Sequence, residues 1–175
     1  MPVTINGSAG VTTNVGAVYN GLQTGTAVAS TSGTSIDFTG IPSWVKRITV
    51  MLSGVSANGT SPMQVQVGSG SFTTSGYFVN VVGVNSGTGQ VNATTGFYVN
   101  AGTTAASVTT GQLTLSLLSS NTWVGTGLFL YTNNAGAMTM MSGNISLSGT
   151  LDRLRITTVN GTDTFDAGTI NIIYE

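Results

Sequence analysis

The sequence predicts an all-β protein, an antiparallel β-sandwich with jelly-roll-like connectivity. From residue 35 onward, nearly every segment is a short run of Val, Ile, Leu, Thr or aromatic residues bounded by Gly, Asn or Ser. Asn-Gly pairs at 58–59 and 160–161 are typical of tight turns between strands. No segment shows the period of an amphipathic helix, and about ten strands in one domain favour a sandwich.

The expected strands follow one another with short polar loops between them. A glycine at position 143 predicts a break in the strand that contains it, because glycine weakens a strand interior. The run at 119–122 predicts a hairpin turn that leads Trp123 into the next strand. The strands are expected at 35–39, 45–54, 63–68, 76–84, 95–100, 112–118, 122–131, 137–147, 151–158 and 169–174.

Alternating apolar residues indicate which face of each strand is buried. In the strand at 45–54, Ile48, Val50 and Leu52 share one face and Arg47 lies on the other, because successive side chains of a strand point to opposite sides. The same pattern recurs in three later strands. We therefore predict a core that includes Leu113, Leu115, Leu117, Leu154, Ile156, Ile170, Ile172 and Tyr174.

Composition divides the chain into an N-terminal arm at 1–34 and a sandwich domain at 35–175. The arm consists of Gly, Ser, Thr, Asn and small apolar residues, with one aromatic residue, Tyr19, and no charge. Such a segment is either a flexible linker or an attachment segment that becomes ordered on binding neighbouring proteins. Residues 3–6 are suited to adding a strand to the sheet edge of another chain.

Charge is scarce along the whole chain. Four Lys and Arg and five Asp and Glu give a net charge of −1, and the mean hydropathy is +0.29. Four cations are too few for a nucleic-acid partner, and no apolar run is long enough to span a membrane as a helix. The N-terminus lacks the pattern of a signal peptide, so synthesis in the cytoplasm is expected. Weak repulsion between copies predicts an oligomer or a component of a larger assembly.

The residue types exclude most catalytic chemistry. Without His or Cys, the chain has neither a Ser-His-Asp or Cys-His arrangement nor an imidazole or thiolate metal site. Asp163 and Asp166 form the only acidic pair close in sequence. They are interpreted either as a Ca²⁺ site or catalytic dyad, or as a turn whose carboxylates cap backbone amides. No cofactor is expected.

Aromatic residues offer a possible carbohydrate site. Tyr77, Tyr98, Trp123 and Tyr131 are candidates for stacking on sugar rings, as on a host surface polysaccharide. The alternative is that these rings pack in the core or at a subunit interface, because a domain of this size needs large apolar side chains.

Two further groups of residues are candidates for subunit contacts. Met138 and Met140 are typical of adaptable packing at an interface. Arg47, Arg153 and Arg155 are expected to meet Asp152 or an acidic group of a neighbouring subunit, if the strands that carry them lie close together. The alternative for these cations is that they are solvated charges that keep an apolar strand from aggregating.

Three runs of the sequence resemble a module of tailed bacteriophages. They are SIDFTGIPSWVKRITVMLSGVSANGTS (35–61), SLLSSNTWVGTG (116–127) and SGTLDRLRITTVNGTDTFDAGTINIIYE (148–175). The module is found at the C-terminal end of tail-fibre-like proteins and as small stand-alone virion proteins. The resemblance implies a structural protein of the virion that forms a trimer, and it carries no catalytic residues.

Two functions are therefore expected from the sequence. The first is a non-enzymatic, homotrimeric tail-fibre-type appendage that binds a receptor, with residues 1–34 attached to a tail protein. The second is a capsid decoration protein, whose trimers sit on the head shell and stabilise it through contacts of residues 1–34 with the major capsid protein. A polysaccharide depolymerase is the remaining alternative, and it would depend on very few carboxylates.

Overall fold

The computed structural model is all-β and antiparallel, which confirms the predicted fold class. No helix occurs in the part of the chain that the structure describes. Two sheets pack as a β-sandwich, and the jelly-roll connectivity stays a prediction. The structure describes the backbone at 4–6, 10–12 and 18–19, and backbone and side chains at 21–84, 89–100, 105, 107–132 and 137–175.

The larger layer is a nine-stranded antiparallel sheet. Its strands follow the order β11, β10, β15, β14, β13, β7, β17 and β4, and β5 also pairs with β17. The bounds are β4 (Gln23–Thr24), β5 (Val28–Ala29), β7 (Arg47–Ala57), β10 (Phe78–Val84), β11 (Gly89–Ala93), β13 (Val108–Ser119), β14 (Thr122–Thr132), β15 (Ala137–Ser146) and β17 (Phe165–Tyr174).

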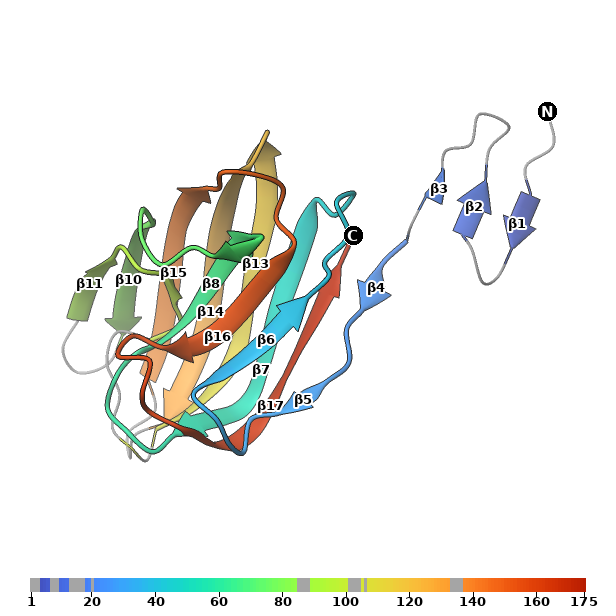
Figure 1. Ribbon diagram of the computed structural model, residues 1–175. Coiled ribbons are helices and arrows are strands. Elements are labelled where there is room, and N and C mark those ends of the chain that lie inside the picture. Colours follow the sequence, from blue (N-terminus) through green and yellow to red (C-terminus); the bar gives the residue numbers. More distant parts are fainter. Residues whose placement is uncertain are drawn as a thin grey trace.

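The smaller layer is a five-stranded sheet that lies across the larger one (Figure 1). Its strands follow the order β12, β8, β16 and β6, with β9 paired to β8. The bounds are β6 (Ser35–Thr39), β8 (Met63–Ser69), β9 (Ser71–Phe72), β12 (Phe97–Tyr98) and β16 (Arg153–Thr158). A separate three-stranded sheet consists of β1 (Thr4–Asn6), β2 (Gly10–Thr12) and β3 (Val18–Tyr19).

The core lies between the two sheets and is built from the predicted faces. Ile48 and Val50 of β7 are completely buried, and so are Leu154 and Ile156 of β16. The remaining predicted core residues are also buried, except Leu117 and Tyr174, which are half-buried and pack against the core at its margin. Alternation was sufficient for this prediction because one face of each strand is in water and the other in the core.

Two aromatic residues tie the sheets together. The ring of Phe97 packs edge-on against Tyr77, with centroids 5.3 Å apart. The Tyr77 hydroxyl accepts a hydrogen bond from the Val67 amide of β8 at 2.9 Å and donates one to the Thr73 carbonyl at 2.9 Å. Tyr77 directly precedes β10 of the larger sheet, so its side chain links both layers.

Most strand predictions agree with the structure, although six short strands were missed. β6 has the predicted bounds, and the hairpin turn lies between Ser119 and Thr122 as expected. The predicted break at Gly143 is wrong, because β15 continues through it. A Cβ at Gly143 would lie 2.4 Å from the Phe78 carbonyl oxygen, so glycine permits close approach of β10 here. The missed strands are β2, β3, β4, β5, β9 and β11.

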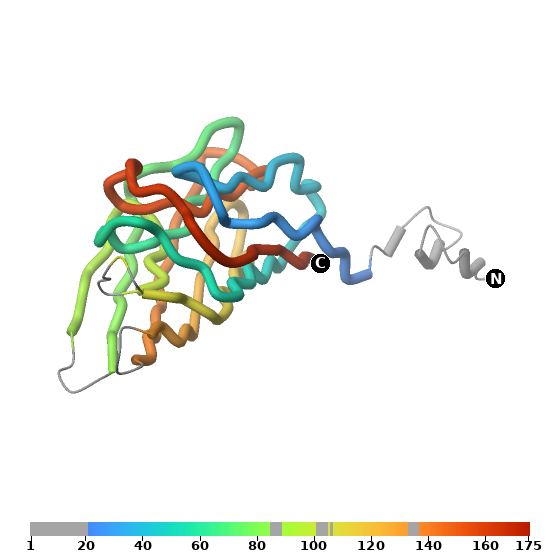
Figure 2. Tube along the Cα trace, turned by 90° about the horizontal axis from the view of Figure 1, so that it is seen from below, coloured from blue at the N-terminus to red at the C-terminus, as the bar shows by residue number. Residues whose placement is uncertain are grey.

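The last part of the predicted arm belongs to the larger sheet. β4 and β5 pair with β17, and this segment runs beside the C-terminal strand in Figure 2. The Gly25 amide, directly after β4, donates to the Ile172 carbonyl at 2.8 Å, and the Ser30 amide, directly after β5, donates to the Gly168 carbonyl at 2.9 Å. These bonds cover the edge of β17, which would otherwise present unpaired backbone groups. The side chains of residues 1–20 lie outside the described part.

Candidate interaction surface

Six apolar side chains form two rows on the outer face of the larger sheet. Each row crosses three neighbouring strands, β10, β15 and β14, at paired positions. Val82 is half-buried, and the other five side chains are between 45% and 52% exposed. One row is Val84, Met138 and Leu130, and the other is Val82, Met140 and Leu128. We call these six residues the apolar rows.

The strands around the apolar rows carry no charge. None of the Lys, Arg, Asp or Glu residues of the sequence lies on β10, β11, β13, β14 or β15. Polar neutral side chains surround the rows. Gln112 of β13 is paired with Leu128, and Gln90 of β11 is paired with Val82. All charged residues lie on or beside β6, β7, β16 and β17. One half of the larger sheet is therefore a neutral, partly apolar surface.

The outer face of the smaller sheet has the opposite character. Arg155 of β16 forms a two-pronged ion pair with Asp37 of β6, with both nitrogen-to-oxygen distances at 2.7 Å. Its guanidinium also lies over the Phe72 ring, 4.1 Å from the centroid. Hydrogen bonding to the Asp37 carboxylate raises the pKa of Arg155 further above its usual value. This cluster fixes the register of β6 against β16.

Arg153 pairs with its neighbour in sequence on the same face. Its Nε donates to the Asp152 carboxylate at 2.7 Å, and these side-chain hydrogen bonds lower the pKa of Asp152. The Asp152 carboxylate also accepts from the Gly70 amide at 3.1 Å. The predicted meeting of Arg153 with Asp152 is thus present within one chain.

Glutamines complete the polar face of the smaller sheet. Gln64 and Gln66 of β8 are buried although they point away from the core. The Thr95 hydroxyl donates to Gln64 Oε1 at 2.9 Å, and Gln66 Nε2 donates to the Thr95 carbonyl at 3.0 Å. These bonds hold the chain before β12 against β8. With Arg155 and Asn160, the glutamines line a polar depression.

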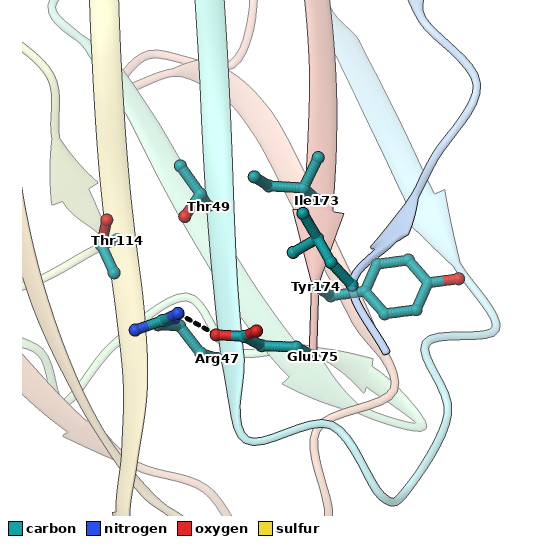
Figure 3. Close-up of a pocket in the computed structure, with 7 residues that line it drawn as sticks. Arg47, Thr49, Thr114, Ile173, Tyr174 and Glu175 are labelled. Carbon is teal, nitrogen blue, oxygen red and sulfur yellow. Dashed lines mark ion pairs between the residues drawn. The ribbon is translucent and has the colours of Figure 1, made fainter. Parts of the chain in front are cut away.

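Arg47 lies in the larger sheet and has a different partner from the one expected. It forms an ion pair with Glu175, next to Thr114 on the adjacent strand (Figure 3). The amides of Lys46 and Arg47 both donate to the Glu175 carbonyl, at 2.7 and 2.8 Å. Of the two expected partners, Asp152 does not contact Arg47, because β7 and β16 belong to different sheets, and an acidic group of a neighbouring subunit stays a prediction. Arg47 instead joins the start of β7 to the residue after β17.

The four aromatic candidates for a carbohydrate site are in the wrong environment for that role. Tyr77, Tyr98, Trp123 and Tyr131 are all less than 10% exposed, so their ring faces are not available to a sugar. They support the alternative of core packing. Burial raises the pKa of Tyr77 to about 12. Among the described aromatic residues, Phe78 of β10 is the most exposed, at 78%.

Asp163 and Asp166 are engaged by separate parts of the protein. The Asp163 carboxylate accepts from the Ser61 amide at 3.0 Å and from Asn160 Nδ2 at 2.6 Å. Asp166 accepts a hydrogen bond from the Ser56 hydroxyl. The Asp163 contact fits the interpretation as a carboxylate that caps a backbone amide at a turn, whereas Asp166 of β17 binds a side-chain hydroxyl of β7. Among the described residues, no three His, Cys, Asp or Glu side chains are grouped as metal ligands.

Sequence reasoning found part of the neutral surface and missed the rest. It selected Met138 and Met140 as interface residues, and both are exposed in the apolar rows. It did not select Leu128 or Leu130, because the run from Gly127 to Tyr131 is apolar at nearly every position. The available signal was alternation with Phe129, which is completely buried and so places its neighbours outside.

Comparisons with family models, curated proteins and solved structures returned no match. Within the described residues, no helix has the length and apolarity needed to cross a membrane. The surfaces described above are therefore the basis for inferring function.

Proposed function

We propose that this chain is a non-enzymatic structural protein of a tailed-bacteriophage particle, a trimeric tail-fibre-type appendage with a β-sandwich head. The observation that supports the proposal is the neutral outer face of the larger sheet, with five large apolar side chains about half exposed. Contiguous apolar surface of this kind marks contact sites between proteins. The resemblance of residues 35–61, 116–127 and 148–175 to the phage module supports the choice of particle.

In this proposal the N-terminal arm and the outer face of the smaller sheet have different roles. Residues 1–34 attach the head to a tail protein, and the docking of β4 and β5 on β17 provides a fixed starting point for the preceding residues. The polar face of the smaller sheet, with the partly exposed Arg155 and the exposed Asn160, faces solvent and is available to a host surface. A polysaccharide receptor would contact these polar groups and not the buried tyrosines.

The location on the particle is tested by antibody labelling of purified particles in the electron microscope. We expect label at the tail only. Label distributed over the head would contradict the tail-fibre assignment and support a capsid decoration protein, which the neutral face would suit equally. Particles that carry no label, with the chain absent from them by mass spectrometry, would contradict both assignments.

A further inference from the structure

We propose that copies of this chain pack against one another through the apolar rows on the outer face of β10, β15 and β14. The inference deepens the proposed function by naming the subunit interface, and it rests on that function only in taking the chain to be part of an assembly. Its occupant is a second copy of this chain.

The first argument is geometric. The rows lie side by side on three hydrogen-bonded strands, and β15 is the middle strand. Met138 and Met140 of β15 are therefore at the centre of the patch, with two valines of β10 on one side and two leucines of β14 on the other. The two leucines are Leu128 and Leu130. Side chains that are paired across adjacent strands and two residues apart along each strand form one continuous patch. Flexible methionines at the centre let two such patches adjust to each other.

The second argument is area. Five neighbouring strands, about 4.8 Å apart with a rise of about 3.4 Å per residue, give the uncharged face a projected area of roughly 700 Å². A stable protein interface buries about 600–1,000 Å² on each partner. The face is therefore large enough for a specific interface, and its apolar centre with a neutral polar rim has the composition expected of one.

The third argument is charge. A surface without charge matches another surface without charge, and a charged partner would lose hydration on contact without gaining a counterion. The chain itself supplies a matching surface, because five of its most exposed large apolar side chains lie on this face. With a net charge of −1, two copies repel each other only weakly.

The test is sedimentation velocity of the purified full-length chain at micromolar concentration. We expect one oligomeric species, and we expect Leu128→Lys to give a species of 17.7 kDa, the mass of one chain. Leu22→Lys is the matched control, because Leu22 is 61% exposed and lies beside β4, at the opposite end of the larger sheet from β11 and away from the uncharged face. It should leave the oligomer unchanged.

A monomeric wild-type chain would overturn the inference, and so would a Leu128→Lys variant that assembles as well as the Leu22→Lys variant. A wild-type dimer that Leu128→Lys dissociates would support this interface and contradict the trimer of the proposed function, so the two failures can be told apart. Circular dichroism of each variant verifies that the β-structure is retained.

Cross-linking provides a second measurement that does not depend on a disruptive substitution. The sequence contains no Cys, so a single cysteine introduced by Met140→Cys or by Leu22→Cys is the only thiol present. We expect a short bismaleimide to join two copies of the Met140→Cys protein and to leave the Leu22→Cys protein largely unjoined. Equal cross-linking of both variants would contradict an interface at the apolar rows.

Discussion

The outer faces of the two sheets differ although both belong to one sandwich. The smaller sheet presents Arg155, Asp37, Arg153 and buried glutamines, and its polar groups are tied to one another or to backbone. The larger sheet presents the apolar rows among neutral side chains, with no ion pair along the five strands from β11 to β13. A face whose groups are already paired suits solvent, whereas a face of half-exposed apolar side chains gains from being covered.

The largest predicted effect on the free energy of unfolding concerns Tyr77, which links the two layers. The two outer faces differ only as long as this link keeps the sheets packed together. Removing the Tyr77 hydroxyl by Tyr77→Phe leaves the Val67 amide and the Thr73 carbonyl without their partner. We expect a loss of about 1–3 kcal/mol in the free energy of unfolding at neutral pH, measured by urea denaturation. Tyr98→Phe, a change at a similarly buried ring, is the control.

Tyr77 also predicts that the free energy of unfolding falls with rising pH in the alkaline range. The folded-state pKa of Tyr77 is about 12, above the ordinary value of 10.0. The folded state therefore holds this proton more tightly, so the stabilisation is complete below pH 10.0 and is lost as pH rises toward 12. We expect the wild type to lose roughly 2–3 kcal/mol more than Tyr77→Phe across this range. Parallel curves for the two proteins would contradict this assignment.

A smaller effect is expected at the charged face. Asp37→Asn removes the counter-charge of Arg155, and both side chains are about one-third exposed. Partly exposed ion pairs contribute about 0.2–1 kcal/mol, and salt weakens them. We therefore expect a coupling free energy in this range from the double-mutant cycle of Asp37→Asn with Arg155→Gln, decreasing at high salt. A coupling free energy of zero at low salt would show that this ion pair does not stabilise the fold.

The smallest effect on the folded chain is expected at the neutral face. Leu130 is 46% exposed, so Leu130→Thr should change the free energy of unfolding of the dilute chain by no more than about 0.5 kcal/mol. The melting temperature should behave differently. It should rise with protein concentration in the wild type and rise less in the variant, because association stabilises the folded state. Equal concentration dependence in both proteins would place the subunit contact elsewhere.

The sequence predicted the parts of this protein that follow from local periodicity. Period-two alternation assigned Ile48, Val50, Leu154 and Ile156 to the core, because each strand has one face in water. Short Gly-bounded and Asn-bounded runs predicted β6 and the hairpin between β13 and β14. The same reasoning failed for β4, β5 and β9, because two-residue strands carry no period and form only where a longer strand offers its edge.

Tertiary structure alone decided which distant residues meet. Arg47-Ile48-Thr49 and Arg155-Ile156-Thr157 are the same tripeptide, yet one arginine pairs with Glu175 in the larger sheet and the other with Asp37 in the smaller. Strand order, which brings these carboxylates within reach, is set by packing over the whole chain and leaves no local mark in the sequence. For the same reason composition could predict an uncharged surface, but only the order β10, β15, β14 gathers its apolar side chains into two rows.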